Sequence, residues 1–157
     1  NVMLGYWNMK KETNEIIKDG WLHIGDIGEI TNDGNLKITD RKNEIIVNLG
    51  GDNISPSKIE NLLCLNEKIK QSFVFGDKKT YLVALIVSEN EENQKEIENY
   101  LENLNKSLSL VEKVKKYKII KEEFTIENGM LTPTLKIKRK KILEKYKEDL
   151  EKLYKFN

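Results

Sequence analysis

The chain has 157 residues, of which 38 % are apolar and 34 % charged, and its 27 basic and 26 acidic side chains nearly cancel. This balance argues against a dedicated nucleic-acid-binding domain, which usually carries a clear basic excess. One cysteine and one histidine exclude a disulfide framework and argue against a metal cluster.

The start of the chain and its apolar runs suggest where the protein works. No run approaches the ~18–20 apolar residues that a membrane-spanning helix needs, so we expect a soluble, cytoplasmic protein. Asn1 is not a methionine, and residues 2–7 read like the middle of a folded region. We therefore expect the chain to be part of a longer protein.

The first forty residues predict one short helix and several short strands. Met9–Lys18 has a weak helical period that ends at Asp19-Gly20. Short alternating strands follow at residues 21–23, 28–31 and 36–39. Asp33-Gly34 lies between the last two and favours a hairpin, because both residue types tolerate a positive φ. This part is predicted to be rich in β-structure.

A polar segment, residues 40–44, precedes an apolar strand at residues 45–47. Gly50-Gly51-Asp52-Asn53 then predicts a turn. Ser55-Pro56 is typical of a helix start, with serine as the N-cap and proline at the first helical position. We expect that helix to end near Cys64 or Leu65.

The rest of the chain alternates between strands and helices. Strands are predicted at residues 72–75 and 81–87, a helix from Glu91 to about Tyr117, a strand at residues 119–125, a turn at Asn128-Gly129 and a last helix at residues 139–154. This order is typical of a small α+β domain of about 115 residues, in which helices pack on a short sheet.

Several short motifs allow two interpretations each. The Asp26 carboxylate could accept hydrogen bonds from vicinal sugar hydroxyls or cap a turn, and Arg41 could contact ribose or phosphate or form a solvated ion pair. Gly50-Gly51 matches no nucleotide-binding glycine pattern, so it indicates either a turn with positive φ or a close approach to a ligand.

A basic run surrounds the start of the last helix. It comprises Lys136, Lys138, Arg139, Lys140 and Lys141. Positive charge at a helix N-terminus opposes the helix dipole, which a site for an anion would justify. A solvated surface and a patch that faces RNA or an anionic membrane remain the alternatives.

Five blocks in a fixed order carry a family resemblance. They are Asn1–Trp7, Asp19–Glu29, Leu36–Lys42, Gly50–Pro56 and Leu131–Lys136. The series closely resembles the C-terminal end of the AMP-binding, adenylate-forming synthetases, specifically the long-chain fatty acid–CoA ligases. The resemblance implies that residues 1–40 are the β-rich end of the large AMP-binding domain. Residues 41–157 would be the small, mobile C-terminal lid domain.

The resemblance also implies an activity. Such a ligase converts ATP and a fatty acid to acyl-AMP and pyrophosphate, and then acyl-AMP and coenzyme A to acyl-CoA and AMP. ATP/AMP and CoA would be substrates, and the ligands of Mg²⁺ are expected in the N-terminal domain that this chain lacks. That domain would be the partner of this chain, nucleic acid would not, and peripheral membrane contact stays open. We expect the chain alone to be inactive.

Site residues follow from the same resemblance. The family's nucleotide-binding positions match Asp26 and Arg41, which would contact the ribose, and Ile38, which would lie near the nucleotide. Asn43 would occupy the hinge about which the lid rotates. Gly50 and Gly51 would help form the passage for the pantetheine arm of CoA.

Lys136 matches the catalytic lysine, which stabilises charge on the carboxylate and the α-phosphate. Leu135 stands where many relatives have glycine before that lysine, and Ile24 where the family usually has threonine. Two alternatives stay open: a non-enzymatic module that binds RNA or an anionic membrane, and the lid of another enzyme that activates acyl or aryl acids.

Overall fold

The computed structural model describes residues 2–42, 44–90 and 93–155. The chain divides into two compact units, residues 1–44 and residues 45–157. The sequence predicts a domain boundary after residue 40. The assignment of residues 1–40 and 41–157 to two domains of a larger enzyme stays a prediction.

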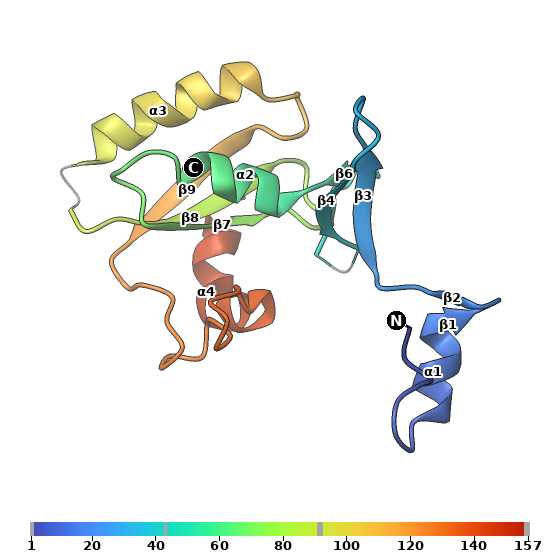
Figure 1. Ribbon diagram of the computed structural model, residues 1–157. Helices are drawn as coiled ribbons and strands as arrows, with labels where there is room; N and C mark the ends of the chain where they lie inside the picture. Colours follow the sequence, from blue (N-terminus) through green and yellow to red (C-terminus); the bar gives the residue numbers. More distant parts are fainter. Residues whose placement is uncertain (1, 43, 91–92, 156–157) are drawn as a thin grey trace. The chain divides into compact units, whose positions relative to one another are not determined.

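Unit 1, residues 1–44, is a short helix followed by two small antiparallel ladders (Figure 1). Helix α1 (Lys10–Ile16) leads into the pair β1 (Ile17–Lys18) and β2 (Trp21–Leu22), and β3 (Asp26–Ile30) pairs with β4 (Leu36–Arg41). The β3–β4 hairpin turns where the sequence predicts it, with Gly34 at φ +76°. Thr31 stabilises this turn, because its Oγ1 accepts a hydrogen bond from the backbone N–H of Asn35 at 3.2 Å.

Unit 1 has no buried core of its own among its described side chains. Trp7 is 90 % exposed and Trp21 77 % exposed. Nine further large apolar side chains of this unit are exposed: Val2, Leu4, Tyr6, Met9, Ile24, Ile27, Ile30, Leu36 and Ile38. An apolar surface of this extent is typical of an interaction face rather than of an independent domain.

Because unit 1 buries so little, its removal should leave the rest of the fold intact. We expect residues 45–157 alone to unfold cooperatively with the helix and strand content of unit 2, and residues 1–44 alone to lack stable structure. Circular dichroism with thermal unfolding of both pieces checks this. A shortened chain that unfolds without a cooperative transition would contradict it.

Unit 2, residues 45–157, is built on a three-stranded sheet in the order β7 (Gln71–Phe75), β8 (Leu82–Val87) and β9 (Val114–Ile120). The central strand β8 runs antiparallel to β7 and parallel to β9. All six residues of β8 are buried, as expected of a strand covered on both faces. A two-stranded ladder, β5 (Ile46–Val47) with β6 (Asn53–Ile54), precedes the sheet.

Helices cover the two faces of this sheet (Figure 1). Helices α2 (Pro56–Leu63) and α3 (Gln94–Ser107) pack with Leu82, Ala84 and Ile86 in one buried cluster. Helix α4 (Arg139–Lys152) packs with the alternate residues Val83, Leu85 and Val87 in a second cluster. The α+β fold predicted from the sequence, a short sheet flanked by helices, is thus confirmed.

The predicted helix from Glu91 to Tyr117 is wrong in its second half. Helix α3 ends at Ser107, and residues from Val114 onward form strand β9 instead. The Ser109 hydroxyl donates to Glu112 at 2.7 Å, and the Asn105 side-chain amide exchanges two hydrogen bonds with the backbone of Val114. These local hydrogen bonds compete with helix formation. The predicted strand at residues 119–125 correspondingly begins earlier and ends at Ile120.

One charged pair connects α2, β7 and α4. Arg139 Nη1 lies 2.8 Å from Glu60 Oε1, and the two side chains are 17 % and 9 % exposed. The same Glu60 oxygen accepts the backbone N–H of Val74 at 2.8 Å, and Arg139 also donates to the carbonyl of Val74. The guanidinium carbon lies 4.5 Å from the centre of the Phe73 ring. This pair ties the start of α4 to the opposite layer through the sheet.

Candidate functional site

Asp26 and Arg41 lie directly opposite each other on β3 and β4. Asp26 opens β3 and Arg41 closes β4, so the antiparallel register makes them partners. Arg41 Nε lies 3.5 Å from Asp26 Oδ1, with the aspartate side chain 25 % and the arginine 60 % exposed. Such an exposed pair is worth about 0–1 kcal/mol. A carboxylate and a planar donor side by side are suited to vicinal hydroxyls.

Ile38 lies two pairs along the same ladder, opposite Gly28. Gly28 is two residues after Asp26 on β3, and a register shift between Ile27 and Gly28 lets Ile38, three residues before Arg41, lie on the face of the Asp26–Arg41 pair. A Cβ at Gly28 would lie 3.0 Å from the backbone oxygen of Lys37 and 3.3 Å from Ile38 Cδ1. Ile38 is half exposed on this face. Three sequence-predicted residues are therefore brought together in unit 1.

The predicted hinge residue, Asn43, lies outside the described residues. Its neighbours are held on the unit 1 side by backbone hydrogen bonds. The N–H of Lys42 donates to the carbonyl of Gly25 at 2.8 Å, and the N–H of Glu44 to that of Arg41 at 2.9 Å. The hinge stays a prediction.

Gly50 and Gly51 form the turn between β5 and β6, where the sequence predicts a turn with positive φ. Gly51 has φ +86°, a conformation that L-residues with side chains rarely adopt. Asn48 closes the turn, because its Oδ1 accepts the Asp52 N–H and its Nδ2 donates to Asp52 Oδ2, both at 2.9 Å. A Cβ at Gly50 would come within 3.3 Å of both side chains.

This glycine hairpin is fastened to the turn between β7 and β8. The Leu49 N–H donates to the Lys79 carbonyl at 2.9 Å, and the Lys78 N–H donates to the Val47 carbonyl at 2.8 Å. Lys79 Nζ in turn lies 2.8 Å from Glu151 Oε2 and 4.8 Å from the ring centre of Tyr154. Burial raises the pKa of the Tyr154 phenol, whose hydroxyl donates to the carbonyls of Phe75 and Tyr81. The glycine hairpin is thereby linked to the C-terminal end of α4.

Lys136 lies on a short hairpin just before α4. An isolated bridge between Leu131 and Ile137 closes it, and the Lys138 N–H donates to the Met130 carbonyl at 2.8 Å. Met130 and Leu131 are buried in the second core cluster, with Ile137 partly buried against it. The base of this hairpin is therefore anchored in the core, while Lys136 itself is exposed.

The hairpin tip has a recognisable turn geometry. The Leu135 N–H donates to the Thr132 carbonyl at 2.9 Å across Pro133, and Leu135 follows at φ +60°. A turn followed by one left-handed residue is a common three-residue hairpin loop, in which glycine is preferred at the left-handed position. Leu135 occupies that position here, at a cost of about 1–2 kcal/mol.

Lys136 has no ion pair or side-chain hydrogen bond within the described part of the chain, whereas Arg139 and Lys141 of the same basic run each have an ion pair. Arg139 faces inward to Glu60, and Lys141 lies 3.2 Å from Glu144. Glu122 lies upstream of the hairpin in the sequence. The Lys145 ammonium and the Tyr146 hydroxyl hold the pKa of its carboxyl below the ordinary value. The basic run is thus not one continuous solvent-facing patch.

Two features of the site were missed in the sequence. Glu60 is a charged residue on the buried stripe of α2, next to Ile59, which could have indicated a buried partner. Thr132 precedes a proline in a turn, where a hydroxyl can bond to the backbone, and its Oγ1 accepts the Lys136 N–H at 3.0 Å.

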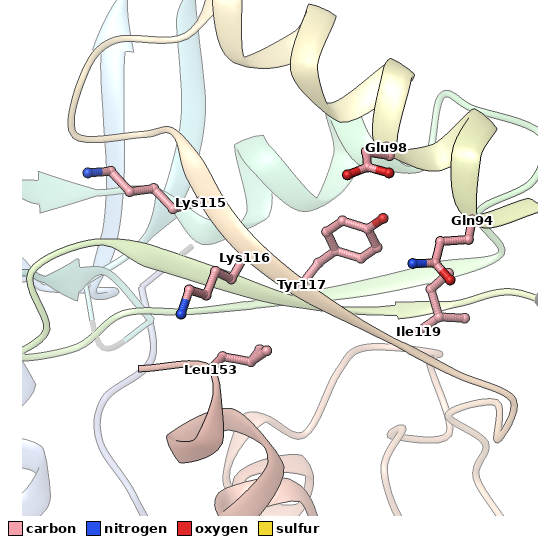
Figure 2. A pocket seen from close by; sticks show the side chains of 7 residues that line it. All are labelled: Gln94, Glu98, Lys115, Lys116, Tyr117, Ile119 and Leu153. Atoms are coloured by element: carbon pink, nitrogen blue, oxygen red, sulfur yellow. The ribbon is translucent and has the colours of Figure 1, made fainter. Parts of the chain in front are cut away.

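A shallow groove of about 500 Å³ lies away from these loops, between α3 and β9 (Figure 2). Its lining residues are Gln94, Glu98, Lys115, Lys116, Tyr117, Ile119 and Leu153. Burial and the Glu98 carboxylate raise the pKa of the Tyr117 phenol. The lining carries both signs of charge and includes no sequence-predicted site residue.

Within the described residues, no group of three or more His, Cys, Asp or Glu side chains could hold a metal ion. None of the helices in this part of the chain is long and apolar enough to cross a membrane.

Comparisons with known proteins give a consistent result. Residues 43–157 match the family model for the AMP-binding enzyme C-terminal domain. Long-chain-fatty-acid–CoA ligase FadD15 of Mycobacterium tuberculosis is 36 % identical over 98 % of this chain, which covers 30 % of the relative. Long-chain-fatty-acid–CoA ligase 6 of Rattus norvegicus is 37 % identical over 98 % of the chain, which covers 26 % of it.

A solved structure agrees. The A-PCP didomain of the carboxylic acid reductase from Segniliparus rugosus, determined in complex with AMP, is 25 % identical to this chain. It superposes with a TM-score of 0.86 over 98 % of this chain and 23 % of its own.

Proposed function

Because the chain belongs to the family of AMP-binding enzyme C-terminal domains, we propose that it is the C-terminal part of a long-chain fatty acid–CoA ligase. The curated relatives above support the assignment at 36–37 % identity. The chain spans 26–30 % of their length, so the activity needs the remaining, N-terminal domain. We assign residues 1–40 to the end of that domain and residues 41–157 to the lid.

The observation that carries the proposal is the exposed Lys136 at the tip of a hairpin anchored in the core. In the first step a fatty carboxylate oxygen attacks the α-phosphorus of ATP, and the bond to pyrophosphate breaks. Negative charge builds on the carboxylate and the α-phosphate, and a positioned ammonium stabilises it. In the second step the CoA sulfur attacks the acyl carbon, and AMP leaves.

The residues of unit 1 fit a role in nucleotide binding. Asp26 would accept hydrogen bonds from the two ribose hydroxyls, Arg41 would contact the same sugar, and Ile38 would lie against the nucleotide. The exposed face that these three share is consistent with this role. Gly50 and Gly51 would line the pantetheine passage. Mg²⁺ would be held by residues outside this chain, and no step assigned here depends on it.

A fusion protein tests the proposal. This chain would replace the corresponding C-terminal part of the FadD15 ligase. Adenylation would be measured as the release of pyrophosphate in the presence of palmitate and ATP. We expect the fusion to form palmitoyl-AMP and palmitoyl-CoA, and both the truncated FadD15 and this chain alone to remain at background. A fusion that folds but forms no palmitoyl-AMP would count against the proposal that this chain is part of a fatty acid–CoA ligase. AMP release by the chain alone, dependent on palmitate, would contradict its expected inactivity.

The structure does not favour the rival binding module, since Arg139 and Lys141 are engaged with carboxylates. Such a module would bind RNA or anionic vesicles with an affinity that falls steeply with salt. Tight binding of this kind by the chain would overturn the proposal.

A further inference from the structure

The hydroxyl of Thr132 lies at the centre of the Lys136 hairpin. Thr132 Oγ1 accepts the backbone N–H of Lys136 at 3.0 Å and lies 3.0 Å from Thr134 Oγ1. The Thr132 backbone N–H also donates to the Lys136 carbonyl at 2.8 Å. Lys136 is thus held on both its N–H and its carbonyl by a single residue.

This arrangement matters because the rest of the tip is open to solvent. Pro133, Thr134, Leu135 and Lys136 are all exposed, so packing does not fix their conformation. Leu135 is in the left-handed region at φ +60°, which is unfavourable for leucine. The hydrogen bond from the Lys136 N–H to Thr132 Oγ1 therefore opposes relaxation of the backbone on either side of Lys136.

We propose that Thr132 is the positioning residue of Lys136: its hydroxyl fixes the backbone from which the lysine side chain extends, and so its placement for the adenylation step. The inference rests on the proposed function. Thr132 is not itself a catalytic residue, since it acts through Lys136. A catalytic group held in the wrong place loses rate steeply even when it remains present.

Three variants separate this role from a loss of folding. Thr132→Val keeps the shape of the side chain but removes the acceptor, and Thr132→Ser restores it. Thr31→Val is the matched control, because Thr31 accepts the N–H of Asn35 four residues later in the β3–β4 hairpin by the same geometry. All three would be made in the chain and in the FadD15 fusion.

In the fusion we expect Thr132→Val to lower the kcat of adenylation about tenfold. This is the size of effect expected when one hydrogen bond that orders the Lys136 backbone is lost. The KM values for ATP and palmitate should change little, as should thioester formation from supplied palmitoyl-AMP. Thr132→Ser should recover most of the rate, and Thr31→Val should leave it unchanged. Wild-type adenylation by Thr132→Val, or an equal loss in Thr31→Val, would overturn the proposal.

Amide hydrogen exchange in the chain itself provides a second measurement. Thr132→Val should raise the exchange rate of the Lys136 amide several-fold, while the amides of β8 keep theirs. Unchanged exchange at Lys136 would overturn the positioning role even if the fusion were inactive. Inactivity of the fusion with the unaltered sequence would count separately, against the proposed function.

Discussion

Replacing Arg139 by methionine is expected to lower the free energy of unfolding of the chain by about 3–5 kcal/mol. The substitution removes the Arg139 guanidinium from beside the Glu60 carboxylate, whose side chain is 9 % exposed. Arg139 also donates to the Val74 carbonyl and stacks on Phe73, so three layers of the fold lose a shared contact. Urea denaturation followed by circular dichroism measures the change.

Lys141→Met is the matched control, since Lys141 lies in the same helical turn and pairs with Glu144 at the surface. It should change the free energy of unfolding by no more than about 0.5 kcal/mol. The double variant Glu60→Met with Arg139→Met should recover part of the loss, because it removes the buried Glu60 carboxylate together with its partner Arg139. A loss below about 1 kcal/mol in Arg139→Met would show that the pair is not effectively buried.

The second large effect concerns activity. Lys136→Ala in the FadD15 fusion is expected to lower the adenylation rate by about 10²–10³-fold, the range found when one donor to a developing negative charge is removed. The hairpin fold should survive, because its hydrogen bonds to Thr132 use the Lys136 backbone and not its side chain. Thioester formation from supplied palmitoyl-AMP should be affected much less, since the α-phosphate has by then already reacted.

Lys140→Ala provides the comparison for Lys136→Ala. Lys140 is an exposed lysine of the same basic run, in the first turn of α4. Its loss should leave adenylation within about twofold, as expected of a surface charge outside the site. Equal losses in both variants would indicate that overall positive charge, rather than a placed ammonium, supports the reaction.

Local signals in the sequence located most of the helices and turns. Ser55 caps α2 by accepting the Lys58 N–H at 3.3 Å, with Pro56 as the first helical residue. Gly34 and Gly129 both have positive φ in predicted turns. In these places the residue types that define a feature lie within four positions of each other, so a short segment contains the whole physical cause.

The features that the sequence did not predict depend on contacts between distant segments of the chain. Leu108, Val111 and Val114 continue the helical spacing of α3 but belong to a loop and a strand. Val114 is buried in the same cluster as Ile97 and Leu101 of α3, and Val111 packs against that cluster. Arg139 reads as one of several basic residues, yet its partner Glu60 is 79 positions away. The proximity of Ile38 to Asp26 and Arg41 likewise depends on a register shift at Ile27 and Gly28. Such effects arise from tertiary packing, which spacing along the chain does not specify.

The Lys136 hairpin and the glycine hairpin are both connected to helix α4. The Lys136 hairpin joins the start of the helix, and the glycine hairpin is tied through Lys79 to Glu151 near its end. A helix of 14 residues holds these two anchor points about 20 Å apart. If the lysine serves adenylation and the glycine turn serves CoA, a movement of α4 that displaces one loop also displaces the other, because both are joined to the same helix.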